Sequence, residues 1–456
     1  MYKKILIASL TLIAGLASCK KDDPTPSPNP PSGLTIDGVA STLEFYQLDT
    51  AHLSVAGVAK DAAAKAVWAV NGAKAAEGAT FDFTTAHPGK YEVTLTVDGK
   101  SAKHTYTVAP RFSEGAFLLN EGNFGNETGS LTYIHPSKKL VIDQAYYRVN
   151  GTKLGNVCQD LAFGNDQIYI LSQLGPKNGG EGLLTIASSN SLEKVKVYND
   201  EALAQSTPTH IAVLRDHIYI RTERDGILRG SSEGGFTPIA GTNKALKQRM
   251  AQIGERLFAL TSDSKVLMIQ GSQVVRELDL SPAKPSGIAV SHEGKLWVST
   301  TSPNAILKVD PTPDNFVALD RHILDKSIST TGPQSWERTT SSAFFAHGDK
   351  LYFTGQSSVI YCHDFATSKT SQVIDVKTID GVGTSANKYY NSLGVDPATG
   401  ELYYAAFEDY STYNKKNVTM VLKADGTKLL LKEKVNSFPA GFYFIPNAAS
   451  RTGANR

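Results

Sequence analysis

Arginine, lysine, tyrosine and tryptophan recur together in the polar segments that separate the apolar runs of this sequence. Guanidinium and ammonium groups bind anions, and aromatic rings stack on flat ligands and attract cations placed over their faces. Interleaved in this way, such side chains suit a large ligand that is both anionic and aromatic. The candidate ligand-binding residues are Asn123, Phe124, Arg148, Gln173, Lys177, Arg221, Arg224, Arg249, Trp336, Arg338, Tyr389, Tyr390, Tyr410 and Tyr413.

The elements that must position these residues form a repeat. Each copy has a turn with Gly or Asp, then a few β-branched or aromatic residues, then polar residues. The copies are FLLNEG, DQIYILSQ, DHIYIRTE, ERLFALTS, GKLWVSTT, DKLYFTGQ and GELYYAAF. The steps between copies are roughly 40 to 55 residues, as in the four-stranded blades of a β-propeller. Another apolar strand precedes each copy except the first, and the missing partner is PAGFYFIP, at residues 439–446. Pairing of the two chain ends would close the ring and remove its open edges.

The sequence therefore predicts an all-β chain with a seven-bladed β-propeller over residues 111–448. Six or eight blades are the alternatives if a weak blade near Met250 is assigned wrongly. Before the propeller, residues 34–110 alternate apolar and polar positions between Gly, Asn and Pro breaks, which predicts a small β-sandwich. Its Trp68 strand, HPGKYEVTLTV and TYTV resemble an Ig-like module of the PKD type.

Loop lengths indicate which face of the propeller binds. In a blade of strands A to D, the A–B and C–D turns share one face, and the B–C and D–A loops share the other. The A–B turns are short here, whereas D–A and B–C segments are long and polar, notably 320–342 and 377–391. Function usually lies in long loops on a rigid scaffold, so we expect the site on the D–A/B–C face, over the central channel. The alternative is that these lysines and arginines only solubilise the surface and that the tyrosines pack between blades.

The first residues predict export. Lys3 and Lys4 precede a short apolar run and the box Leu-Ala-Ser-Cys, which ends at Cys19. This pattern predicts a lipoprotein signal peptide at residues 1–18, too short for a spanning helix, with the lipid on the thiol of Cys19. Residues 19–33 are rich in Pro and predict a stiff tether. The segment KKDD after Cys19 resembles the tag that sends Bacteroidetes lipoproteins to the outside of the outer membrane.

Composition excludes other classes. The 46 basic and 44 acidic residues nearly balance, which argues against a nucleic-acid partner. After lipidation only Cys158 and Cys362 remain, in apolar strand-like segments, so we expect buried free thiols and no disulfide framework.

The segment FLLNEGNFGNETGSLTYIHP, with the following AYYRVNGTKLGNVCQDLAFGNDQIYIL, resembles the start of the YncE-like, DUF5074-type propeller lipoproteins of Bacteroidetes. That resemblance implies capture of a metal chelate, a ferric siderophore or cobalamin, for a partner TonB-dependent transporter. The mixture of cations and rings favours a ferric catecholate siderophore. Cobalamin is the alternative. Its binding would need flat apolar surfaces together with side chains such as Asn and Gln, which can form hydrogen bonds with its amides. A third interpretation, from another class, is a surface adhesin that binds a protein or glycan.

Catalysis has less support in the sequence. Asn120 and Glu121 could ligate a metal as in propeller lactonases, but a hard cation needs several converging oxygens, and no matching acidic set follows on the other inner strands. No histidine pair has metal-site spacing. Adjacent cysteines and repeated tryptophan motifs, typical of quinone-cofactor propellers, are also missing. We therefore expect no enzyme activity, no metal and no cofactor.

Overall fold

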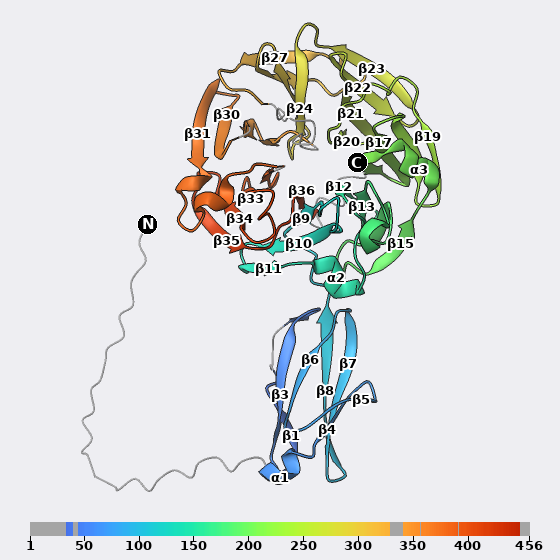
Figure 1. The fold of residues 1–456 in the computed structure, drawn as a ribbon, viewed down its shortest axis with the longest axis vertical. Coiled ribbons are helices and arrows are strands. Elements are labelled where there is room, and N and C mark those ends of the chain that lie inside the picture. The colour runs from blue at the N-terminus through green and yellow to red at the C-terminus, as the bar shows by residue number, and fades with distance from the viewer. Residues whose placement is uncertain (1–32, 40–43, 329–340, 356, 391, 447–456) are drawn as a thin grey trace, which may run out of the picture. The chain divides into compact units, whose positions relative to one another are not determined.

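The computed structural model describes residues 33–39, 44–328, 341–355, 357–390 and 392–446, and its regular structure is mainly β-strand (Figure 1). Three predicted functional positions, Cys19, Trp336 and Arg338, lie outside these ranges. Within the described ranges, no helix combines the length and the apolar composition that crossing a membrane requires.

The chain divides into two compact units. The smaller unit comprises Met1–Thr42, Ala51–Phe83 and Tyr91–Tyr106, and the larger one Leu43–Thr50, Thr84–Lys90 and Thr107–Arg456. Segments 43–50, 84–90 and 107–110 of the predicted sandwich thus group with the larger unit.

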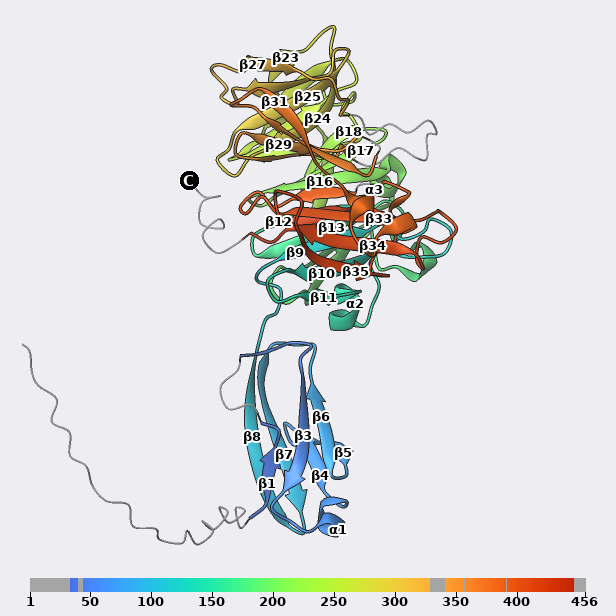
Figure 2. The ribbon, with the colours of Figure 1, turned by 90° about the vertical axis from the view of Figure 1, so that its left-hand side faces the viewer.

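Two sheets account for the strands up to residue 109. One sheet contains β1 (Thr35–Asp37), β3 (Thr50–Ala56) and β6 (Thr80–Thr84). The other contains, in this order, β2 (Phe45–Tyr46), β8 (Lys100–Ala109), β7 (Gly89–Val97), β4 (Val67–Val70) and β5 (Ala73–Glu77). The short helix α1 (Lys60–Ala63) lies between β3 and β4 along the chain (Figure 2). Alternate side chains of β7 are buried, as expected for a strand with one covered face. Trp68 is fully buried in this core, and its indole Nε1 donates to the carbonyl of Gly78 at 2.9 Å.

The larger unit contains seven antiparallel four-stranded sheets among the described residues, and each has the order of the chain except where the two ends meet. From the inner to the outer strand, the first three sheets are β36 (Pro439–Phe444), β9 (Ala116–Asn120), β10 (Ser130–His135) and β11 (Leu140–Ile142); β12 (Cys158–Gly164), β13 (Gln167–Ser172), β14 (Leu184–Ser188) and β15 (Lys194–Tyr198); and β16 (Pro208–Leu214), β17 (His217–Thr222), β18 (Gly226–Ser231) and β19 (Gly234–Pro238).

The other four sheets follow in the same order. They are β20 (Ala251–Ile253), β21 (Arg256–Leu260), β22 (Lys265–Gln270) and β23 (Gln273–Asp279); β24 (Lys284–Val290), β25 (Leu296–Thr301), β26 (Ala305–Val309) and β27 (Ala318–Ile323); β28 (Phe344–His347), β29 (Lys350–Phe353), β30 (Val359–Asp364) and β31 (Lys369–Asp375); and β32 (Leu393–Val395), β33 (Leu402–Phe407), β34 (Asn417–Leu422) and β35 (Lys428–Glu433).

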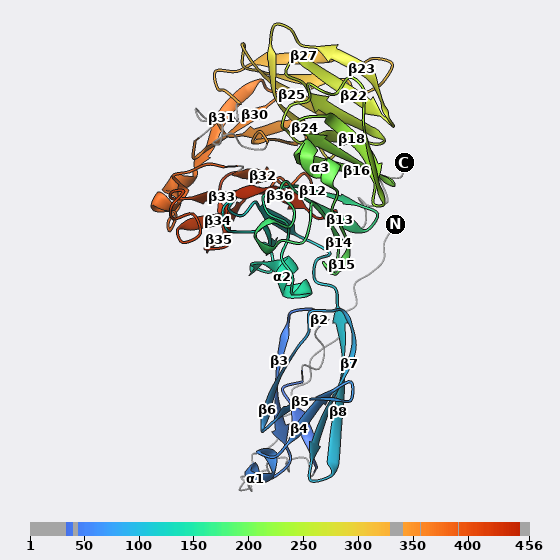
Figure 3. The same cartoon turned by 45° about the vertical axis from the view of Figure 1, so that its right-hand side comes forward.

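The sheets are arranged around a common centre, with β12, β24 and β36 towards it and β15, β23 and β31 at the periphery (Figures 1 and 3). Burial explains the sequence pattern of each strand. Every residue of β9, β33 and β34 is buried, because both faces of these middle strands pack against neighbouring sheets. The outer strand β27 is mostly exposed.

The two ends of the larger unit are paired, as the sequence predicts. Strand β36 is antiparallel to β9, with Phe442 opposite Leu118 and Phe444 opposite Ala116. The first sheet is thereby completed by the last strand of the chain, and the inner edge of β9 is covered by hydrogen bonds.

Connections differ in length between the two ends of the strands. The A–B turn between β12 and β13 has two residues, whereas the D–A connections carry the helices α2 (Ala145–Asn150) and α3 (Glu201–Ser206) and the 3₁₀ turns η3 (Val376–Thr378) and η4 (Gly383–Ala386). A further 3₁₀ turn, η1 (Lys177–Gly179), lies in the B–C connection of the second sheet. Helix α3 begins where Asp200 accepts a hydrogen bond from Leu203 N at 2.8 Å.

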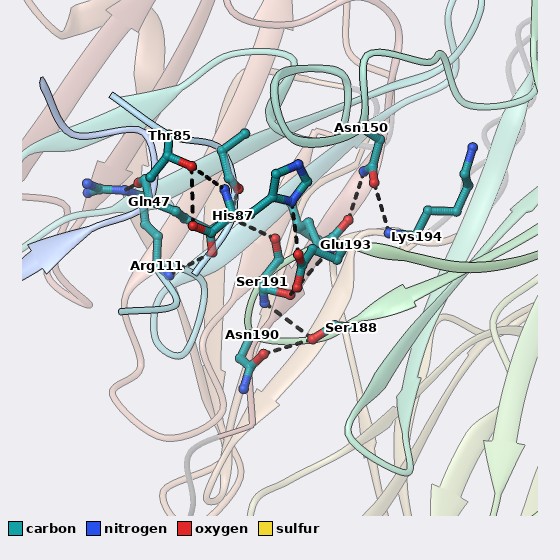
Figure 4. Close-up of polar contacts among 12 residues, drawn as sticks. Gln47, Thr85, His87, Arg111, Asn150, Ser188, Asn190, Ser191, Glu193 and Lys194 are labelled. Carbon is teal, nitrogen blue, oxygen red and sulfur yellow. Dashed lines mark hydrogen bonds and ion pairs between the residues drawn. The ribbon is translucent and has the colours of Figure 1, made fainter. Parts of the chain in front are cut away.

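Figure 4 shows why residues 43–50 and 84–90 group with the larger unit. Gln47 is buried, and its amide donates to the carbonyls of Ser191 at 2.9 Å and Ala86 at 2.8 Å. Its oxygen accepts from the backbone N–H of Arg111 at 3.1 Å. His87 Nδ1 lies 2.9 Å from a carboxylate oxygen of Glu193. These contacts anchor both segments to the connection between β14 and β15.

Candidate functional site

Five aromatic rings gather on the B–C/D–A side of the larger unit. We call this set, Tyr390, Phe407, Tyr410, Tyr413 and Phe438, the Phe438 aromatic group. The other four ring centroids lie 6.3, 5.4, 6.0 and 4.3 Å, respectively, from that of Phe438. The rings come from the end of β33 and from three connections, β31–β32, β33–β34 and β35–β36. Three of the five, Tyr390, Tyr410 and Tyr413, are among the binding residues predicted from the sequence, whereas Phe407 and Phe438 are not.

Phe438 has a backbone conformation that is unusual for its residue type. Its φ is +53°, in the left-handed region that costs a residue with a side chain roughly 1–2 kcal/mol. Surrounding hydrogen bonds fix this conformation: Glu121 N donates to the carbonyl of Phe438 at 2.8 Å, and Ser437 N donates to Asn120 Oδ1 at 3.0 Å. Strain retained by its surroundings is typical of ligand sites, and here it accompanies a ring placed among four others.

A buried acid lies beside the aromatic group. Glu121 is only 7 % exposed, and the Tyr390 hydroxyl donates to its two carboxylate oxygens at 3.0 and 3.1 Å. The Gln159 amide donates to the same group at 3.0 Å. Burial raises the pKa of Glu121 to about 7, although the charge of Lys247 and both hydrogen bonds act in the opposite direction. Near neutral pH this carboxyl therefore exists in both protonation states.

A second acid, Glu127 in the β9–β10 connection, also contacts the aromatic group. Glu127 Oε2 accepts hydrogen bonds from the Tyr413 hydroxyl at 2.9 Å and from Ser437 Oγ at 2.8 Å. The Asn156 amide donates to the carbonyl of Glu127 at 2.6 Å. Among the described residues, the amide oxygens of Asn156 and Gln159 are buried and have no hydrogen-bond partner. Two unpartnered acceptors, one in the connection before β12 and one in β12 itself, thus lie beside the acids that bind Tyr390 and Tyr413.

Three lysines lie over aromatic rings on this side. Lys177 Nζ is 3.6 Å from the ring centroid of Phe124, whose side chain is 64 % exposed. Lys388 lies 5.4 Å from the ring of Tyr410, and Lys377 lies 5.7 Å from that of Tyr389. Each distance is within the range of cation–π attraction. Cations and rings are therefore paired on this side, with lysine as the cation.

The predicted arginines do not form one patch. Arg221 is buried and donates to the carbonyl of Ala245 at 3.0 and 3.2 Å and to Thr209 Oγ1 at 3.2 Å. Arg148 is exposed on α2, with its Nε bonded to the carbonyl of Asp143 at 2.8 Å. Arg224 is exposed in the β17–β18 connection. Sequence analysis treated all of them as loop cations open to a ligand, because it cannot show which loop side chains fold inward.

The guanidinium of Arg249 lies in the centre of the larger unit. Its Nε is 3.1 Å from Asp160 Oδ1, its Nη2 donates to the carbonyl of Ala440 at 3.3 Å, and it lies 4.1 Å from the ring centroid of Tyr443. The Tyr443 hydroxyl donates to Asp160 at 2.6 Å. Burial raises the pKa of Asp160, and the charge of Arg249 opposes that effect.

A cavity of about 430 Å³ extends from this ion pair. Its walls are the inner strands, and most of the lining side chains are apolar, among them Ile211, Ile288, Phe345 and Phe444. We call it the channel cavity. No residue of the Phe438 aromatic group lines it.

Taken residue by residue, the predicted site is partly assembled. Tyr390, Tyr410 and Tyr413 meet in one group, and Phe124 pairs with Lys177. Asn123 and Gln173 are half-buried in the neighbouring B–C connections. Sequence reasoning missed Phe438, Gln159, Asp160 and Tyr443. Phe438 lies in a D–A connection, and that location is the signal that could have identified it. Gln159, Asp160 and Tyr443 lie within strands, where no such signal exists.

In the part of the chain that the structure describes, no group of three or more His, Cys, Asp or Glu side chains could hold a metal ion. The Asn120 amide donates hydrogen bonds to Ser130 Oγ at 3.2 Å and to Thr132 Oγ1 at 3.3 Å, and its oxygen accepts one from Ser437 N.

Comparison with known proteins places the larger unit in a family. The model of a domain of unknown function, DUF5074, matches residues 114–446. The chain belongs to the DUF5074 family. That span contains every strand of the seven sheets. No protein with a curated function matches the chain.

This DUF5074 chain is also similar to solved structures. A quinoprotein alcohol dehydrogenase-like protein from Bacteroides thetaiotaomicron is 15 % identical, with a TM-score of 0.59, and the match covers 90 % of this chain and 98 % of that one. A protein from Lactobacillus plantarum is 13 % identical with a TM-score of 0.47, over 73 % of this chain and 99 % of that one. The first likeness supports an all-β, propeller-type fold built from four-stranded sheets.

Proposed function

We propose that this chain is a lipid-anchored, surface-exposed capture protein that binds a large metal chelate and passes it to a TonB-dependent outer-membrane transporter. In this proposal each four-stranded sheet is one blade of a seven-bladed propeller, and the smaller unit is an Ig-like or PKD-like spacer. The observation that carries the proposal is the Phe438 aromatic group, which collects rings from three connections and the end of β33 on the B–C/D–A side.

A capture protein needs a preformed surface rather than reactive groups. The Phe438 aromatic group is held by Glu121, Glu127 and Asn120 through hydrogen bonds that do not involve a ligand. Loops already close to their bound shape lose little conformational entropy on binding, which raises affinity. A lipid on Cys19 and a Pro-rich tether would keep the site near the transporter and raise the effective concentration for transfer.

The charges around the group favour cobalamin among the two chelates. Arg221 and Arg249 are engaged by internal partners, and Glu121 and Glu127 lie next to the rings, so the surface offers little to a trianion. Cobalamin has a broad flat face and an edge of amides, which stacked rings and neighbouring Asn and Gln groups can match. A ferric catecholate siderophore is the second candidate, because Lys177, Lys377 and Lys388 each lie over a ring.

Calorimetric titration of the mature chain without Cys19 tests the proposal. Cyanocobalamin and a ferric tris-catecholate are titrated in parallel, and saturable binding of one of them is expected. Tyr410→Ala and Phe124→Ala should each weaken that binding by about 1–4 kcal/mol if the side chain is a hot spot. Val195→Ala is the matched control, because Val195 is an exposed apolar residue on the outer strand β15.

Absence of binding to both chelates would remove the capture proposal and leave adhesion to a protein or glycan as the next hypothesis. Binding that survives both aromatic substitutions would place the ligand elsewhere on the chain. Localisation is tested separately: external protease should remove the chain from intact cells, and Cys19→Ala should release it from the membrane fraction.

A further inference from the structure

The channel cavity has two chemically different ends. Asp160, Arg249 and Ser341 lie at one end, near the start of the inner strands. At the other end the lining reaches Pro397, in the A–B turn between β32 and β33, and Phe444, the last residue of β36. The cavity therefore runs from a polar layer inside the ring to the side that carries the short A–B turns, opposite the Phe438 aromatic group.

Most side chains in the wall of the channel cavity are apolar, although Gln248, Gln252 and Ser342 also line it. The apolar part includes half-buried side chains from several inner strands, namely Ala162, Phe163, Ile288, Val290, Phe345 and Phe444. Its volume of about 430 Å³ is within the range of small-molecule sites, roughly 300–1,000 Å³. Such a space favours an apolar molecule with few polar atoms.

The polar end offers one charged donor. Arg249 is 24 % exposed at the side chain, with Nε bonded to Asp160 and Nη2 to the carbonyl of Ala440. Among the described residues these contacts use Nε and Nη2 and leave Nη1 unused. The ring of Tyr443 covers one face of the guanidinium, and Gly441 leaves room for it, since a Cβ there would lie 2.0 Å from Nη2.

Asp160 does not compete strongly for the remaining donor. Its two oxygens already accept from Arg249 Nε, from the Tyr443 hydroxyl at 2.6 Å and from Ile211 N at 2.9 Å. The outer edge of the guanidinium is thus available to another acceptor. Carboxylates are the acceptors that guanidinium binds best, through short, charge-assisted hydrogen bonds.

We propose that the channel cavity is a second ligand site, which takes a monocarboxylate with an apolar body, the carboxylate on Arg249 and the body along the apolar wall. The ligand enters from the side of the A–B turns. This site differs from the proposed chelate site in its residues, in its face and in the chemistry of its ligand, and it does not depend on that function.

The experiment uses decanoate and decanamide as probes for the mature full chain, because they share an apolar body and differ in charge. Decanoate should bind saturably at one site, and decanamide at least tenfold more weakly. Ala162→Trp fills the cavity and should weaken decanoate binding at least tenfold, while Val195→Trp, which places the same side chain on exposed β15, should leave it unchanged.

Charge at the polar end is tested by Arg249→Met together with Asp160→Asn, which removes both charges and should make decanoate bind no better than decanamide. Val290→Phe is the second filling variant if Ala162→Trp does not fold, as judged by circular dichroism. Absence of saturable decanoate binding to the unaltered chain overturns the proposal. So does equal affinity in the filled variants and in Val195→Trp.

Discussion

Asp160 in β12 and Arg249, two residues before β20, form an ion pair inside the larger unit, with Arg249 Nε 3.1 Å from Asp160 Oδ1. The same carboxylate accepts from Tyr443 in β36 and from Ile211 N in β16. One buried acid thus connects segments of four of the seven sheets. An isolated buried charge is costly, so each partner depends on the other.

Asp160→Ala should lower the free energy of unfolding by about 3–5 kcal/mol, because it leaves the Arg249 charge without its partner in the interior. The double variant Asp160→Ala/Arg249→Met should recover part of this loss. Chemical denaturation measures both, and Glu77→Ala, at an exposed ion pair with Lys74, should leave the midpoint unchanged. If the double variant is destabilised by the sum of the single effects, the two groups are not coupled.

Glu121 should make stability depend on pH. Its folded-state pKa of about 7 lies above the ordinary 4.5, so between these values the folded chain binds more protons than the unfolded chain. The contribution is fully present below about pH 4.5 and is lost as pH rises through 7, by about 3 kcal/mol in total.

Glu121→Gln should therefore flatten the change in unfolding free energy between pH 5 and 8, measured by denaturation at several pH values. Glu433→Gln, at the exposed end of β35, is the matched control and should keep the slope. An unchanged slope in Glu121→Gln would show that the carboxyl titrates normally.

Gly441 should be intolerant of any side chain. A Cβ at this position would lie 2.0 Å from Arg249 Nη2, and the φ of +142° is itself unfavourable for other residues. Gly441→Ala should lower the free energy of unfolding by about 1–3 kcal/mol through overpacking, in addition to backbone strain. Gly271→Ala is the control for strain alone, since its φ is +60° and nothing lies within 4 Å of the added atom. Equal effects of the two substitutions would contradict the steric argument.

The thiols of Cys158 and Cys362 should react slowly in the folded chain. Cys158 is buried, and burial raises the pKa of its thiol far above the ordinary value. Burial also raises the pKa of Cys362 to about 11. At pH 8 little thiolate is present to attack a disulfide reagent. Labelling followed by mass spectrometry should show Cys362, the less buried thiol, modified before Cys158, and both modified rapidly in denaturant. Rapid labelling of Cys158 under native conditions would contradict its burial.

The sequence alone determined the strand pattern of this protein. Period-two alternation and turn residues recur at a regular spacing, and these local signals suffice to place four-stranded sheets. PAGFYFIP completes the first sheet because its apolar pattern matches the missing inner strand, and β36 pairs with β9 accordingly. Loop lengths predicted a site on the B–C/D–A side, and Tyr390, Tyr410 and Tyr413 lie together in connections on that side.

Only the tertiary structure decided which side chains of those loops meet and which turn inward. Phe438 joins rings that lie up to 48 residues away in the chain (438 minus 390) through a left-handed backbone that no local signal predicts for Phe. From the sequence, Arg249 is predicted to be an exposed cation in a loop. In the structure it pairs with Asp160, which is 89 residues distant in the chain and lies within a strand. The physical reason is that periodicity depends on neighbours along the chain, whereas partners across the ring are set when closure brings the inner strands of different sheets together.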